Sequence, residues 1–110
     1  MSADCEAWII EIGWDLSERK ERSLTPLERL IEKFWFIDYC MRNGGDLANL
    51  ADHPGGAGAF LREAAGEAKA LGFWQINALM SLAPHQFEQN YLAQFELVCG
   101  ELRTAYSING

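Results

Sequence analysis

The segment "TPLERLIEKFWFIDYCMR", Thr25 to Arg42, constrains the fold more than any other part of the chain. Thr25 can cap a helix, Pro26 suits its first turn, and Glu28 can complete a capping box by accepting the Thr25 amide. The helix that follows carries apolar side chains on nearly all sides, and such a helix needs neighbours on several of its faces. The sequence therefore predicts a central helix over residues 25–42, packed against other helices.

The rest of the chain shows helical periodicity, with no alternating strand pattern and no internal repeat. Apolar stripes with spacings of three and four residues lie in residues 5–12, 57–71 and 84–106, and a short apolar segment covers residues 73–82. The first helix ends at Gly13 or continues through Leu16, and the charged run over residues 17–23 is expected to be a connecting loop. With 110 residues, the chain is predicted to form one all-α domain, residues 1–110, with five to six helices.

The chain is acidic, with 16 Asp and Glu residues against 9 Lys and Arg and a formal net charge of -7. This charge argues against direct binding of nucleic acid or of an anionic membrane, because both require a basic face. The acidic residues are densest near the N-terminus, where a helix that continues past Gly13 would place four of them on one face. The predicted partner-binding residues are Asp4, Glu11, Asp15 and Glu18.

Cysteine usage and the lack of targeting signals favour a cytoplasmic protein. The cysteines Cys5, Cys40 and Cys99 are odd in number and far apart, which fits neither a disulfide framework nor a zinc-ligand pair. The sequence has neither a signal-peptide pattern nor an apolar run of about 18 residues, so we expect no membrane association.

No cofactor is predicted. The run "GGAGAFLR" from Gly55 lacks the third glycine of a dinucleotide-binding loop and does not follow a strand. Two short pairs of potential metal ligands, Asp52 with His53 and His85 with Glu88, are too few to predict a metal ion.

The segment from Asp38 to His53, which we call the corner, contains residue types that are common in functional sites. Asn43, Gly44 and Gly45 are first a helix stop, because a glycine there can take the left-handed conformation. Asp46 can cap a short helix, which His53 ends because it precedes a proline.

Asp38 stands on an apolar stripe, so we expect its carboxylate to be buried and to accept backbone N–H groups of the turn. A ligand role for Asp38 and a nucleophilic pair of Cys40 with His53 stay open. The alternative function is a small enzyme or a protein that binds a ligand or metal through Asp38, Asn43, Asp52 and His53.

The segment from Leu24 to Leu82 resembles a family of small bacterial helical proteins that includes a DNA-mimic protein. The matching elements are Leu24-Thr25, Arg29, Trp35, Asn43-Gly44-Gly45 and the predicted helix from Ala57 to Gly72. The resemblance implies a non-enzymatic, acidic and helical protein, which can be a homodimer and which occupies the DNA-binding face of a regulator. Our leading hypothesis is therefore an antagonist of a DNA-binding regulator, or an immunity protein against a toxin, that blocks a basic surface of its partner.

Overall fold

The structure, a computed structural model, describes residues 2–19 and 23–109, with side chains over residues 5–19 and 23–108. The predicted central helix is α2, Pro26–Gly44. Its capping box is present: Thr25 Oγ1 accepts the Glu28 N–H at 3.1 Å, and Glu28 Oε1 accepts the Thr25 N–H at 3.0 Å. The helix ends at Gly45, which has φ 74° and donates its N–H to the Met41 carbonyl at 2.9 Å. The helix stop is thus confirmed for Gly45, while Gly44 belongs to the helix.

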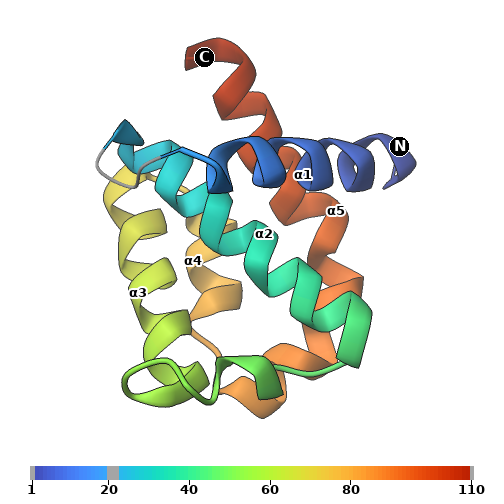
Figure 1. Cartoon of the computed structure of the whole chain (residues 1–110), viewed down its shortest axis with the longest axis vertical. Helices are drawn as coiled ribbons and strands as arrows, with labels where there is room; N and C mark the ends of the chain where they lie inside the picture. The colour runs from blue at the N-terminus through green and yellow to red at the C-terminus, as the bar shows by residue number, and fades with distance from the viewer. Residues whose placement is uncertain (1, 20–22, 110) are drawn as a thin grey trace.

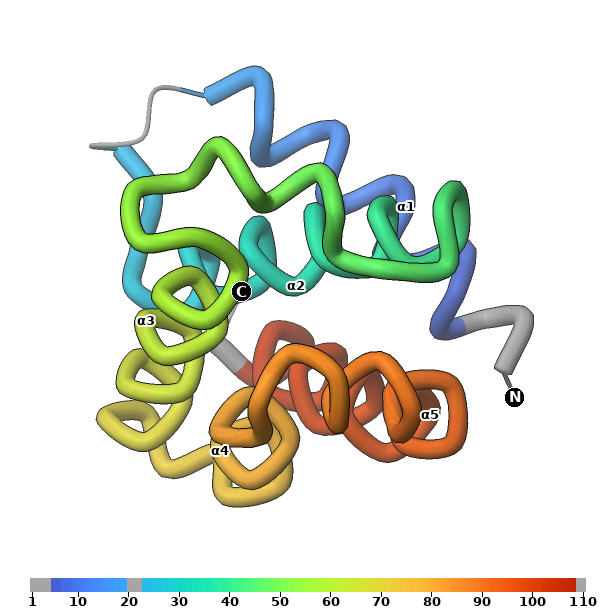
Figure 2. The backbone as a smooth tube through the Cα atoms, turned by 90° about the horizontal axis from the view of Figure 1, so that it is seen from below, coloured from blue at the N-terminus to red at the C-terminus, as the bar shows by residue number. Residues whose placement is uncertain are grey.

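The described residues form four more α-helices besides α2, and the prediction of an all-α domain is confirmed (Figure 1). Helix α1 packs on α2 and α5, α3 packs on α4 and α2, and α4 packs on α5. Figure 2 shows α1 and α2 on one side of the molecule, α4 and α5 on the other, and α3 closing one end. The element bounds are α1 Ser2–Ser17, the 3-10 helix η2 Ala48–Leu50, α3 Gly56–Leu71, α4 Trp74–Met80 and α5 Pro84–Asn109.

Helix α1 continues past Gly13 and ends at Ser17. Gly13 is buried beneath the indole of Trp35, where an added Cβ would lie 2.0 Å from Trp35 Cγ. The glycine thus permits a close approach of two helices and does not stop α1. Of the predicted loop over residues 17–23, residues 20–22 lie outside the described part of the chain.

An aromatic cluster forms the centre of the core between α2 and α5. Phe34 of α2 lies 6.1 Å from Tyr91 and 6.0 Å from Phe95, and Phe87 lies 5.4 Å from Tyr91, measured between ring centroids. All four rings are buried, so they supply much of the apolar area that stabilises a domain of this size.

The long helix α5 keeps the amphipathic pattern expected from its sequence. Phe87, Tyr91, Phe95 and Val98 face the core, whereas Leu97 on the opposite side is exposed. Gly100 lies within the helix and does not end it. Within the described ranges, no helix is both long and apolar enough to cross a membrane.

Candidate functional site

The acidic residues predicted to bind a partner lie on α1 and directly after it. Glu11, Asp15 and Glu18 are exposed; Asp4 belongs to the helix, but its side chain lies outside the described residues. Because α1 is continuous through Gly13, Glu11 and Asp15 fall on one side of it, and Glu18 follows the last residue of the helix in a turn, where its N–H donates to the Asp15 carbonyl at 3.3 Å.

Two exposed apolar side chains of α1 lie beside these carboxylates. Trp14 is 57% exposed and Ile10 is 42% exposed. Trp14 follows Glu11 by three residues and precedes Glu18 by four, so it adjoins these carboxylates, and Ile10 lies one helical turn before Trp14. We call this surface the α1 face, defined by Ile10, Glu11, Trp14, Asp15 and Glu18.

Part of the charge on the α1 face is paired within the protein. Arg19 Nη2 lies 3.0 Å from Asp15 Oδ2, and Arg19 Nη1 lies 3.2 Å from Glu28 Oε2. The Asp15–Arg19 pair is exposed at both ends, so solvent screens it strongly. The Asp15 carboxylate can therefore exchange Arg19 for a basic group of a partner at little cost.

Asp38 differs from its prediction in its hydrogen-bond partners. It is buried as expected, with 2% of its surface exposed, but its carboxylate accepts the Tyr91 hydroxyl of α5 and the Arg42 Nε–H of α2, the latter at 2.9 Å from Oδ2. The turn amide of Leu47 donates to Glu88 Oε2 at 2.8 Å. The expectation that Asp38 binds the turn was wrong, because its side chain lies on the α2 face that packs against α5.

Arg42 extends this buried network to α1. Its Nη1 lies 2.7 Å from Glu6 Oε2, and its guanidinium carbon lies 4.7 Å from the centroid of the Phe95 ring. Burial lowers the pKa of Arg42, but the negative charges of Asp38 and Glu6 have a larger combined effect. The pKa of Arg42 is therefore raised, and its guanidinium stays protonated. Burial, and then the charge of Asp38, raises the pKa of Tyr91, which keeps its hydroxyl protonated as a donor. The network thus joins three helices through fixed hydrogen bonds.

The remaining corner residues satisfy local backbone groups. Asn43 Nδ2 donates to the Tyr39 carbonyl at 2.8 Å, and Asp46 Oδ1 accepts the Ala48 N–H at 3.0 Å, where η2 begins. The expected cap at Asp46 was wrong: the N-cap of this 3-10 helix is Leu47, which makes no side-chain cap bond, and Asp46 closes the turn before it. The 3-10 helix ends at Leu50, before His53.

The structure does not bring the alternative site together. Asp38 lies in the buried network, Asp52 is exposed, and His53 Nε2 bonds Glu63 Oε2 of α3 at 3.1 Å. Cys40 is fully buried, and burial raises the pKa of its thiol, which opposes formation of the thiolate that a nucleophile requires.

The two short pairs of potential metal ligands, from which no metal was predicted, contain residues that bond other partners. Glu88 is bonded to the Leu47 amide, and the ring Nε2 of His85 lies 3.2 Å from Gln89 Nε2. Among the side chains that the structure describes, residues 5–19 and 23–108, no three His, Cys, Asp or Glu form a group that could hold a metal ion.

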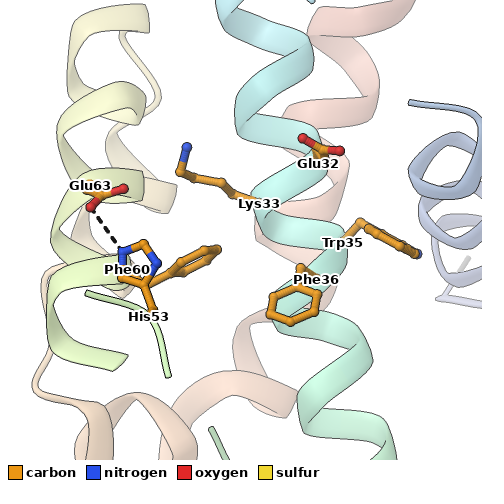
Figure 3. A pocket seen from close by; sticks show the side chains of 7 residues that line it. All are labelled: Glu32, Lys33, Trp35, Phe36, His53, Phe60 and Glu63. Carbon is orange, nitrogen blue, oxygen red and sulfur yellow. Dashed lines mark hydrogen bonds and ion pairs between the residues drawn. The ribbon is translucent and has the colours of Figure 1, made fainter. Parts of the chain in front are cut away.

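A surface cleft of about 360 Å³ lies between α2 and α3, and only one of its residues, His53, was predicted from the sequence as a candidate site residue (Figure 3). Phe36 and Phe60 lie between the two helices, Trp35 extends toward α1, and the His53–Glu63 pair lies on the side of α3. The lining residues are Glu32, Lys33, Trp35, Phe36, His53, Phe60 and Glu63. The signal for the cleft was the excess of aromatic residues on α2 outside its main stripe.

Comparison of the chain with protein-family models, with curated proteins and with solved structures finds no match.

Proposed function

We propose that the protein is a non-enzymatic interaction module that binds a basic surface of another protein through its α1 face. The observation that carries the proposal is the composition of that face, in which the carboxylates of Glu11, Asp15 and Glu18 lie beside the exposed Trp14, with Ile10 next to it. An aromatic anchor within a charged rim is the arrangement that protein–protein interfaces use. The rim speeds association with a basic partner, and the indole supplies apolar area once the partner is bound.

The partner that suits these groups is a protein whose own ligand is anionic. Carboxylates of the α1 face would form charge-assisted hydrogen bonds with the partner's Arg and Lys side chains, which otherwise bind phosphates. A DNA-binding regulator or a toxin with a basic surface meets this description, in line with the resemblance to the family of the DNA mimic. Three free, buried cysteines are consistent with a reducing cytoplasm as the place of action.

The test is capture of the partner on the immobilised full-length chain, followed by binding measurements at about 50 mM and about 300 mM salt. The variant is the double change Asp15→Asn, Glu18→Gln. The matched control is Asp52→Asn, Glu96→Gln, which removes the same charge from two exposed positions outside the α1 face.

We expect the captured partner to be basic, and its association with the α1 variant to be slower and less dependent on salt than with the wild type. The control variant should behave as the wild type. Equal salt dependence in the wild type and the α1 variant, or equal loss of binding in both variants, would overturn the proposal. Loss of function in the control alone would favour the corner around Asp52.

A further inference from the structure

The cleft between α2 and α3 combines aromatic faces with carboxylates. The rings of Phe36 and Phe60 lie 6.1 Å apart at an interplanar angle of 54°, so they form an angled apolar wall. Glu32 and Glu63 also line the cleft, and the Glu63 side chain is 52% exposed. These two kinds of group together favour a ligand that is both planar and positively charged.

The basic residues of the cleft leave this preference in place. The Lys33 ammonium lies 3.1 Å from Glu67 Oε2, so its charge is balanced by a carboxylate outside the lining. His53 contacts one oxygen of Glu63, and a carboxylate offers about four lone-pair sites on its two oxygens. Glu63 therefore keeps acceptor capacity for a second donor.

The protein already holds one arginine with the same set of groups. Arg42 lies over the Phe95 ring and bonds the carboxylates of Asp38 and Glu6. The cleft repeats this combination of aromatic ring and two carboxylates, but no arginine is among the residues that line it.

We propose that the cleft binds an arginine side chain supplied by the partner protein. The guanidinium stacks on Phe36 or Phe60, and its N–H groups donate to Glu63 and Glu32. Arginine fits better than lysine, because its planar guanidinium can stack on a ring and bond carboxylates at once, while an ammonium is compact and strongly hydrated. This proposal rests on the proposed function, since the partner provides the arginine.

The cleft is continuous with the α1 face. Trp35 lines the cleft, and its ring lies 5.3 Å from that of Trp14, at 63° between the ring planes. A partner that covers Trp14 therefore reaches Trp35, and an arginine beside that contact can enter the cleft. The two surfaces form one binding area with two parts.

The test uses the full-length chain, labelled with ¹⁵N, and the probe peptide acetyl-Gly-Arg-Gly-amide. Two further peptides replace arginine by citrulline, which is neutral and nearly the same shape, or by lysine. The variants are Glu63→Gln, which keeps an acceptor for His53, and the matched control Glu96→Gln on α5. Backbone amide shifts map the site and give the dissociation constants.

We expect the arginine peptide to shift amides of the cleft residues on α2 and α3, and the citrulline and lysine peptides to bind several-fold more weakly. Glu63→Gln should weaken binding by about twofold to fivefold, the range for an exposed charge pair, and Glu96→Gln should have no effect. The inference would be overturned if the citrulline or the lysine peptide bound as tightly as the arginine peptide. It would also be overturned if Glu63→Gln left the affinity for the arginine peptide unchanged.

The peptide test can fail separately from the proposed function. A partner that binds through the α1 face while the arginine peptide leaves the cleft unperturbed would refute the cleft alone. A cleft that binds the arginine peptide, together with equal salt dependence of partner binding in the wild type and the α1 variant, would refute the α1 face alone.

Discussion

Replacing Gly13 with Ala is expected to destabilise the protein, although the same change stabilises most helices. Alanine in a helix interior is favoured over glycine by about 1 kcal/mol. At this position, however, the added methyl group would lie 2.0, 2.1 and 2.5 Å from three atoms of the Trp35 indole. The indole is rigid, so either the ring or α1 must move.

The magnitude follows from the two opposing effects. Overpacking a well-filled contact typically costs about 1–3 kcal/mol. Displacing Trp35 also disturbs its contact with Trp14, and aromatic pairs of this kind contribute about 0.5–1.5 kcal/mol. After the gain in helix propensity is subtracted, we expect a net loss of about 1–2 kcal/mol in the free energy of unfolding.

The control is Gly66→Ala. Gly66 lies within α3, and an added Cβ there would meet no atom within 4 Å. This variant should be more stable than the wild type by about 0.5–1 kcal/mol. Urea denaturation of the three proteins, followed by circular dichroism, measures both effects. A Gly13→Ala protein as stable as the wild type, beside a stabilised Gly66→Ala protein, would show that the close approach of Trp35 to α1 is not as described.

Three further predictions concern the central helix and its network. Gly45→Val should lower the free energy of unfolding by at least about 1 kcal/mol, because a β-branched residue resists positive φ. Gly44→Val should change it by less than about 0.5 kcal/mol, and thermal melting of both variants tests the difference. The pKa of Glu28 is lowered, chiefly by its hydrogen bond from the N-cap amide, so its stabilisation is present above the unfolded pKa and is lost as pH falls through the folded one. Glu28→Gln should therefore be less stable than the wild type at neutral pH, and acid unfolding curves should show this difference shrinking as pH falls through the folded pKa of Glu28. Tyr91→Phe removes a donor from the buried carboxylate of Asp38 and should cost about 1–3 kcal/mol in urea denaturation, while an unchanged midpoint would contradict the network.

The elements that sequence reasoning predicted correctly are those specified by neighbouring residues. The capping box needs only Thr25 and Glu28, three positions apart, and the stop at Gly45 needs only a glycine after the last turn. The apolar stripes of α3 and α5 follow from the spacing of apolar residues at every third or fourth position. These features required no knowledge of how the helices pack.

Features that depend on packing were missed or left open. Gly13 reads as a possible stop, because its contact with Trp35 joins segments 22 residues apart. The burial of Asp38 followed from its stripe, but its partner Tyr91 lies 53 residues later in the chain. The cleft depends on how α2 and α3 are rotated about their axes, which neither sequence segment specifies by itself. His53 was therefore predicted as part of the corner, whereas the structure places it in the lining of the cleft.

The bonds from Arg42 also determine how the molecule can open. Folded proteins open locally, a few elements at a time. Here the separation of α1 removes Glu6 from Arg42, and the same guanidinium holds Asp38, which accepts the Tyr91 hydroxyl of α5. Opening of α1 therefore disturbs α2 and α5 at once, and we expect the amides of these three helices to exchange with solvent in one cooperative step. The side-chain bonds of this network do not include α3 or α4, whose helices pack most extensively on each other, so we expect their amides to exchange in a different step.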